Sequence, residues 1–214
     1  MAALITTLID KQDSNEIVRN AVAAILALEE ANQRALAIAA SKDPDLWEFN
    51  VFLERSNPWE DSEMPLVNVM FSNDTMDNKG SNQVSERCAK GQFFVDCYGS
   101  VLASSAEHGD VLSSKDSDRV ARLVRNILMS DVYTYLGLRS IVQSRLVSRR
   151  EKFQPDIRNE AYKNVVGTRL TLDVQYTELG PQAVYQNIEQ IFTQVTLSDS
   201  GQVLAEVLVD NSTP

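Results

Sequence analysis

Few residues in this sequence have side chains suited to chemistry. Among its 214 residues there is one histidine, His108, and there are two cysteines, Cys88 and Cys97. A zinc site made of four His and Cys ligands is therefore excluded. The two cysteines stand nine positions apart rather than in a C-x-x-C pair, which favours two reduced thiols and leaves a single disulfide as the open alternative.

His108 is the natural candidate for a catalytic base. It lies in the polar segment Glu107-His108-Gly109-Asp110, and it would need Cys88 or a serine brought beside it to activate a nucleophile. A single histidine in a loop is more often a solvated side chain. The sequence contains neither G-x-x-x-x-G-K-[ST] nor G-x-G-x-x-G, so no glycine loop is expected to cradle a phosphate. We therefore expect a protein that is not an enzyme, with no catalytic residue and no cofactor or metal, and keep a small hydrolase or a binding module as alternatives.

A basic segment with two aromatic residues, Phe153 and Tyr162, is the other candidate site. Its basic members are Arg145, Arg149, Arg150, Lys152, Arg158 and Lys163. Such a mixture can suit single-stranded nucleic acid. Acidic residues interrupt the segment, however, which favours salt bridges to an acidic protein surface over specific nucleic-acid recognition. A solvated basic face without any partner is the simpler alternative.

The net charge of −10 is distributed very unevenly along the chain. Residues 1–118 carry 9 basic and 20 acidic groups, residues 119–169 carry 11 and 4, and residues 170–214 carry none and 6. Patches of opposite sign on one chain can meet across a subunit interface and fix its register. This distribution favours self-association over wrapping nucleic acid.

The overall composition is that of a globular protein, with 43% hydrophobic and 23% charged residues. No apolar run approaches the roughly 20 residues that cross a bilayer. The N-terminus has no basic stretch before its short apolar run, so we expect a soluble protein that is not exported and does not bind membranes.

The first predicted element is a helix over residues 13–40. Asp13 and Glu16 match a capping box, and one helical stripe carries Val18, Ala21, Val22, Ile25 and Leu28. The helix should end before Asp43-Pro44, because the residue ahead of a proline resists helical geometry. Small side chains in its second half suit close packing on another surface.

Strands are predicted next, at residues 47–53, 64–71 and 92–101, from alternating apolar side chains. Between the last two lies a polar segment, 72–91, which is predicted to be a long loop. In the third strand Phe93, Val95 and Cys97 share one face, so Cys97 is expected to be a small buried hydrophobic residue.

A second helix is predicted from Asp118 onward, after a serine-rich lead at 113–117. Its apolar stripe consists of Val120, Leu123, Val124, Ile127 and Leu128, and Arg119, Arg122 and Arg125 fall on the opposite side.

Two long strands follow, at 139–153 and 166–178. A run of about 13 residues spans roughly 43 Å, about twice an average strand, so part of this hairpin should project from the core. A helical turn with Val184, Ile188, Ile191 and Phe192 and a hairpin of strands 194–197 and 202–209 should complete the chain. Such a hairpin is marginal alone and needs a partner surface, which another subunit can supply.

The predicted fold class is therefore α+β, with a mixed or antiparallel sheet flanked by helices, a long projecting β-hairpin and a C-terminal hairpin extension. We expect one domain with three parts. These are an N-terminal helical segment (1–44), an α/β core (45–178) and a C-terminal helical turn with a hairpin arm (179–214).

The order of these elements resembles that of the tail terminator, or tail completion, proteins of long-tailed bacteriophages, and the related neck proteins of head-to-tail connectors are similar. The resemblance covers about residues 46–178. It rests on the runs PLVNV (65–69), QFFVDCY (92–98), VARLV (120–124) and RLTLDVQYT (169–177), with a long polar loop after the first.

The resemblance implies a structural virion protein with no catalysis. It implies a hexameric ring that caps the tail tube and joins it to the head connector, located in the tail or neck and in the host cytoplasm during assembly. Expected partners are further copies of the chain, the tail tube protein, the connector protein and, in a contractile tail, the sheath. We predict that Arg149, Arg150, Lys152, Arg158 and Lys163 bind the tube or a neighbouring subunit. A neck or head-completion protein is the alternative within this class.

Overall fold

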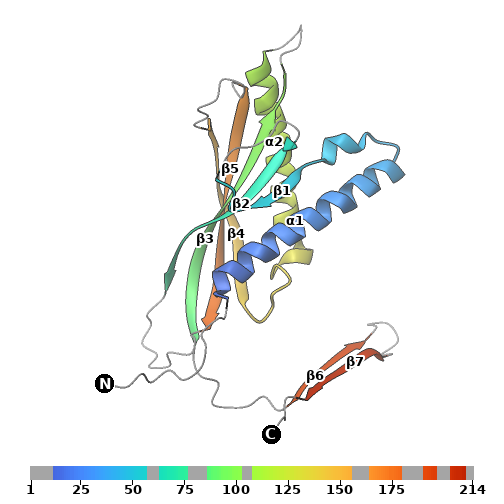
Figure 1. Cartoon of the computed structure of the whole chain (residues 1–214), viewed down its shortest axis with the longest axis vertical. Coiled ribbons are helices and arrows are strands. Elements are labelled where there is room, and N and C mark those ends of the chain that lie inside the picture. Colours follow the sequence, from blue (N-terminus) through green and yellow to red (C-terminus); the bar gives the residue numbers. More distant parts are fainter. Residues whose placement is uncertain are drawn as a thin grey trace. The chain divides into compact units, whose positions relative to one another are not determined.

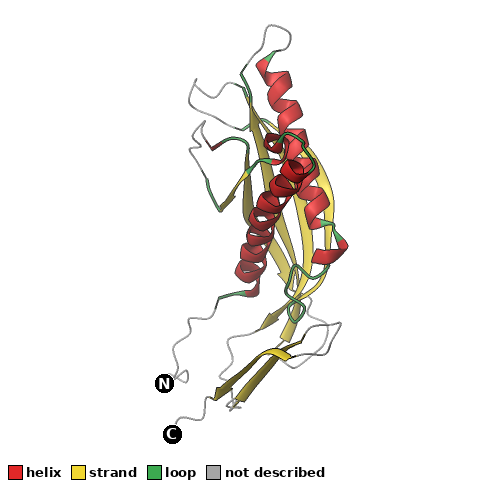
Figure 2. Cartoon of the chain, turned by 90° about the vertical axis from the view of Figure 1, so that its right-hand side faces the viewer, coloured by secondary structure: helices red, strands yellow, loops and turns green. Residues whose placement is uncertain are grey.

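The structure is a computed structural model. It describes residues 12–56, 63–76, 86–102, 108–155 and 164–179, and the backbone of 190–196 and 203–210. Residues 10–180 form one compact unit, and the last two strands belong to another. The larger unit is a twisted sheet with two helices on one face (Figures 1 and 2).

The sheet has five strands in the order β1-β2-β3-β5-β4. The strands are β1 (Asn50–Leu53), β2 (Leu66–Met76), β3 (Glu86–Ser100), β4 (Val142–Phe153) and β5 (Val165–Leu179). The helices are α1 (Ser14–Ala39), α2 (Gly109–Leu128) and the short 3₁₀ turns η1 (Pro44–Trp47) and η3 (Asp131–Tyr133). β1 runs parallel to β2 and the other neighbours are antiparallel, so the predicted α+β class with a mixed sheet is confirmed.

β3 and β5 form the centre of the sheet. All 15 residues of β3 pair with β5, from Glu86 opposite Leu179 to Ser100 opposite Val165. On the face toward the helices the predicted inward residues Phe93, Val95 and Cys97 are fully buried, as are their counterparts Leu170 and Leu172. The long β4–β5 hairpin predicted from the sequence is therefore present, and β3 accompanies it along its whole length.

The two cysteines do not pair. Cys88 and Cys97 lie on the same strand an odd number of residues apart, so they point to opposite faces and stand about 30 Å from each other. Burial raises the pKa of the Cys97 thiol, in keeping with the predicted role of a small hydrophobic residue.

The predicted loop at 72–91 is wrong at both ends. β2 continues to Met76 and β3 already begins at Glu86, with Thr75 opposite Lys90. Tyr176 covers this end of the sheet and donates a hydrogen bond to Asp74 at 2.9 Å. Strands are predicted from alternating apolar residues, and the mostly polar residues at these two strand ends show no such alternation. The strand ends could therefore not be recognised from the sequence. Residues 77–85 lie outside the described part.

Helix α1 confirms the first predicted helix, but not its capping box. The predicted apolar stripe is right for Val18, Val22 and Ile25 and wrong for Leu28, which is exposed while Leu26 is buried in its place. The Asp13 side chain makes no capping hydrogen bond. Instead the Glu178 carboxylate, from β5, accepts the Ser14 N–H at 3.2 Å. A carboxylate at a helix N-terminus is favourable because it meets both an unpaired donor and the positive end of the dipole. After this helix, the strand predicted at 47–53 is present only as β1, which begins at Asn50, because Trp47 is the last residue of η1.

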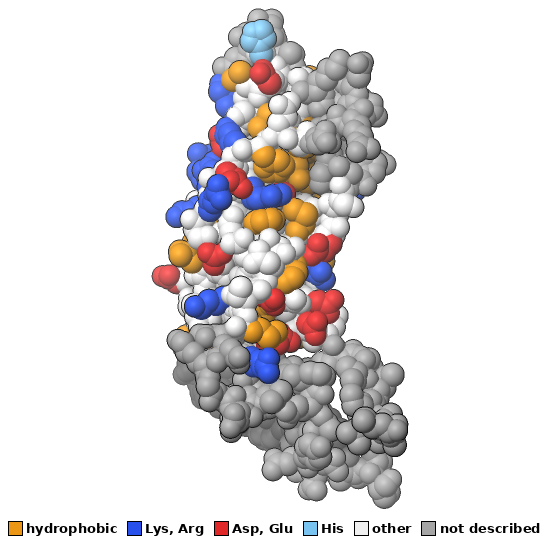
Figure 3. Space-filling view, turned by 90° about the vertical axis from the view of Figure 1, so that its left-hand side faces the viewer, with side chains coloured by type: hydrophobic (Ala, Val, Ile, Leu, Met, Phe, Trp, Pro, Cys, Tyr) orange, Lys and Arg blue, Asp and Glu red, His pale blue; other side chains and the backbone are white. Residues whose placement is uncertain are grey.

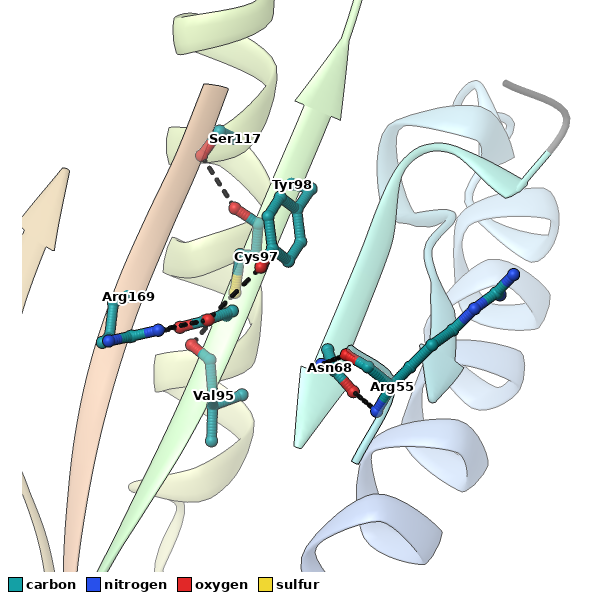
Figure 4. Close-up of polar contacts among 8 residues, drawn as sticks. Arg55, Asn68, Val95, Cys97, Tyr98, Ser117 and Arg169 are labelled. Atoms are coloured by element: carbon teal, nitrogen blue, oxygen red, sulfur yellow. Dashed lines mark hydrogen bonds and ion pairs between the residues drawn. The ribbon is translucent and has the colours of Figure 1, made fainter. Parts of the chain in front are cut away.

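Helix α2 begins at Gly109, so the prediction of a serine-rich lead before Asp118 is wrong. Ser113 and Ser117 are fully buried in the helix. Ser117 Oγ donates to the Cys97 carbonyl at 3.0 Å, and Ser113 Oγ accepts the Val101 N–H at 2.8 Å (Figure 4 shows the first bond). In the sequence these serines suggest a polar segment before a helix. In the structure their small side chains, bonded to the backbone at the end of β3, allow the helix to pack closely on the sheet. The predicted stripe is confirmed, with Val120, Val124 and Leu128 buried and Leu123 and Ile127 partly buried.

The C-terminal hairpin is also present. β6 (Gln190–Thr196) and β7 (Val203–Asp210) pair antiparallel and form a separate two-stranded sheet. Ile191 and Phe192 belong to β6, so their placement in a helical turn is wrong. Val184 and Ile188 lie outside the described residues.

The close approach of α2 to β3 gives a stability prediction at Gly99. A Cβ on Gly99 would lie 2.6 Å from both the Ser113 carbonyl oxygen and the Ser117 nitrogen. Because those atoms belong to the backbone, Gly99→Ala should lower the free energy of unfolding by about 1–3 kcal/mol. Urea unfolding followed by circular dichroism measures the change. Ser100→Ala, on the opposite face, serves as the control and should stay within about 0.5 kcal/mol. Equal midpoints for the two variants would contradict this packing.

Candidate subunit interface

Four of the six basic residues singled out in the sequence, Arg145, Arg149, Arg150 and Lys152, lie on β4, an outer strand of the sheet. Arg149, Arg150 and Lys152 occupy its second half and are exposed; the Arg149 side chain is 70% accessible. Arg158 and Lys163 lie outside the described residues. The structure therefore brings three of the five predicted interface residues together along one edge.

Two of these three residues are already bound within the chain. Arg150 and Lys152 contact the Asp118 carboxylate of α2 at 2.5 and 2.7 Å, and Lys152 also contacts Ser114. Burial alone would raise the pKa of Asp118, but hydrogen bonds and charge from Lys152 and Arg150 outweigh it, so this pKa is lowered. The sequence analysis missed Asp118, because it is more than 30 residues away and pairs only through the packing of α2 on the sheet.

Arg149 points to the other face of the sheet. Its guanidinium lies 2.8 Å from Glu151, on the same strand. An exposed pair of this kind contributes less than about 1 kcal/mol, so it is easily exchanged for a partner's carboxylate. Figure 3 shows this helix-free face, on which basic side chains gather along one margin beside a hydrophobic band.

Arg145 takes a different role from its neighbours. It donates to the Ser130 carbonyl at 2.5 Å, its Nε is buried, and burial lowers its pKa. It therefore anchors the turn after α2 to β4 and is poorly placed to bind a partner.

A buried ion pair that the sequence did not reveal lies between β3 and β5, and Figure 4 labels its Arg169. Arg169 donates to both oxygens of Asp96 at 2.7 Å, and Asp96 is 1% exposed. The guanidinium also lies 4.2 Å from the Phe94 ring centre and 5.1 Å from that of Phe153. Asp96 and Arg169 are directly opposite in register, so only the strand pairing reveals them. The pair joins the two central strands.

A second exposed surface runs along α1. Its outer face carries Ala24, Leu28, Ala31, Ala35 and Ile38, spaced alternately four and three residues apart and all exposed. Leu28 and Ile38 are 64% and 65% accessible. The charged residues of the helix, Glu16, Arg19, Glu29, Glu30 and Arg34, lie elsewhere on it. The outer side of α1 therefore presents an uncharged, apolar stripe to its surroundings.

A cavity of about 430 Å³ lies between α1, α2 and η1. Trp47, Phe49 and Tyr133 supply apolar walls, and Glu29 supplies a carboxylate. Tyr133 donates to Glu29 at 2.5 Å, and this bond lowers the pKa of Glu29. The lining contains no histidine, cysteine or lysine, and the described residues form no cluster of three metal-ligating side chains. His108 is exposed just before α2.

Comparisons with known proteins add no family. No family model matches the sequence, and no curated protein matches it. Among the described helices none is long and apolar enough to span a bilayer.

The buried ion pair gives a prediction with an internal comparison. Arg169→Ala leaves the Asp96 carboxylate buried without its counter-ion and should cost about 3–5 kcal/mol of unfolding free energy. Asp96→Asn should cost less, about 1–3 kcal/mol, because Arg169 remains 27% exposed and can be hydrated. Guanidinium unfolding of both single variants and of the double variant measures the coupling. If the double variant loses as much unfolding free energy as the two single variants together, Asp96 and Arg169 do not stabilise the fold as a pair.

Proposed function

We propose that this protein is a structural component of a bacteriophage tail, resembling tail terminators, that assembles into a homo-oligomeric ring, of six copies by that resemblance. The ring caps the tail tube and joins it to the head connector. It performs this role in the virion, after assembly in the host cytoplasm, by presenting protein-binding surfaces and without catalysing a reaction.

The observation that carries this proposal is the presence of two unlike exposed surfaces on one fold. A ring needs heterologous contacts, in which one face of a subunit meets a different face of the next. The β4 edge and the α1 stripe are two such unlike faces: the basic β4 edge suits an acidic surface of a neighbouring copy, and the uncharged α1 stripe suits an apolar one. β4 is the outer strand at one side of the sheet, whereas α1 packs on β1 and β2 toward the other. Surfaces on opposite sides favour continued association around a ring.

The resemblance supports the same proposal through the order of the elements. Strand β2, the long strand β3, helix α2 and the β4–β5 hairpin follow one another in the order on which the resemblance rests, although the polar segment 72–91 is largely strand rather than one long loop. The additional α1 and the β6–β7 hairpin then extend the subunit beyond this common part.

Two other functions are alternatives to this proposal. A neck or head-completion protein would use the same kind of ring with different neighbours. The cavity between α1 and α2 favours a binding module as the candidate from another class, because its apolar walls and single carboxylate suit a small ligand. Light-scattering mass measurement and negative-stain imaging, with and without purified tail tubes, separate these functions. Sixfold annuli support the ring, and a protein that stays monomeric even on tube ends contradicts it.

Charge reversal at the β4 edge tests the assignment of its residues. We expect Arg149→Glu combined with Arg150→Glu to abolish ring or tail joining, because two attractive contacts become repulsive at each interface. Arg149→Glu alone is the cleaner variant, since Arg150 also holds Asp118. Arg122→Glu, an exposed charge on α2, is the matched control and should assemble normally. Circular dichroism confirms that the variants remain folded, and normal assembly of the double variant would remove the β4 edge from the interface.

A further inference from the structure

The main sheet ends in two edge strands, the four-residue β1 and the twelve-residue β4, and the longer β4 offers more backbone to a partner strand. β4 has β5 on one side and no described strand on the other. β6 and β7 form a two-stranded sheet of their own. A two-stranded sheet is marginally stable alone in water, so this hairpin requires a third strand or a covering surface.

The charges of the β4 edge and of the C-terminal segment are complementary. The accessible basic residues of β4 are Arg149, Arg150 and Lys152, since Arg145 is held by the Ser130 carbonyl. With Glu151 and the Asp118 carboxylate counted against these three, this edge has a net charge of +1. Residues 181–214 carry four acids, Glu189, Asp199, Glu206 and Asp210, and no basic residue, a net charge of −4. Two of these acids lie on β7, where Glu206 is opposite Gln194 and Asp210 is opposite Gln190.

From these observations we propose that the β6–β7 hairpin of one copy adds to the β4 edge of a second copy, so that the main sheet continues from subunit to subunit. In this form of recognition main-chain hydrogen bonds supply affinity, and the side chains along the strand supply specificity. The inference deepens the proposed function, since it rests on assembly of copies into a ring.

The part of β4 that can accept a strand is its second half. Near Val147 the edge is irregular, with a register shift before Arg149, and the Val147 N–H points to the Met129 sulfur at 3.4 Å. From Arg149 to Phe153 the pairing with β5 is regular. β6 has seven residues and β7 has eight, so either is long enough to cover these five.

The same charges explain why β4 would select this occupant. Basic side chains on an edge strand oppose pairing with an identical edge, because like charges would then meet. An acidic strand turns that repulsion into attraction. Arg149 is the most suitable contact, since its exposed pair with Glu151 costs little to break.

Cross-linking of mixed variants tests the inference directly. In a full-length Cys88→Ser background, one preparation carries Ser148→Cys on β4 and the other carries Ala205→Cys on β7; the remaining Cys97 is fully buried. The two are mixed and treated with a short bis-maleimide, which tolerates an unknown register. We expect a covalent dimer joining the two variants. Arg122→Cys mixed with Ala205→Cys is the matched control and should give at least tenfold less.

The mass of the untreated mixture separates the possible failures. Rings without the Ser148→Cys to Ala205→Cys product would overturn the hairpin contact and leave the proposed ring intact. A double variant that cross-links within one chain, without any product between chains, would show that the hairpin pairs with its own β4 and would also overturn the inference. Chains that stay monomeric even with tail tubes would overturn both proposals. The Ser148→Cys chain can also be made without its own β6–β7 hairpin. A cross-linked product between this chain and the Ala205→Cys chain would support the contact, because the shortened chain can contribute only its β4 edge.

Discussion

The pairing of β3 with β5 is the constraint on which the rest of this structure depends. Its 15 residue pairs span about 50 Å and give the sheet its length. β2 and β4 attach to its two sides, α2 packs on it through Ser113 and Ser117, and the Asp96–Arg169 pair crosses it. Even the start of α1 is held by Glu178, near the end of β5. The β4 edge and the start of α1 are therefore both positioned by one long antiparallel pair.

This arrangement leaves separated surfaces exposed on one small fold. Most buried residues lie on the helix-covered face of the sheet, where Phe93 and Leu170 form one core with the inner sides of α1 and α2. A smaller cluster, Leu66, Tyr98 and Val165, lies on the other face near one end. Because the core lies between the helices and the sheet, the β4 edge and the outer side of α1 stay exposed, and these are the surfaces on which our proposal of assembly depends.

The elements that could be predicted from the sequence are those whose apolar residues alternate along a strand or recur with the period of a helix. The inward residues of β3 and β5, both helices and the C-terminal hairpin were found in this way. Contacts between residues distant in the chain were not predictable. Ser14 is capped by a residue 164 positions away, and Lys152 pairs with Asp118 on a different element. The strand ends at 72–76 and 86–91 were missed because their polar side chains carry no hydrophobic alternation. Of the predicted interface residues, Arg149, Arg150 and Lys152 all lie on the edge strand β4. Arg150 and Lys152, however, contact Asp118 of the same chain.

The contact between Glu178 and Ser14 has a mechanical consequence. The chain leaves the main sheet at Leu179, one residue after the carboxylate that holds the start of α1. Tension applied through the C-terminal segment would act first on this end of β5, and peeling it from β3 would release the helix N-terminus at the same step. A load on the arm and the anchoring of the first helix are thus linked through a single side chain.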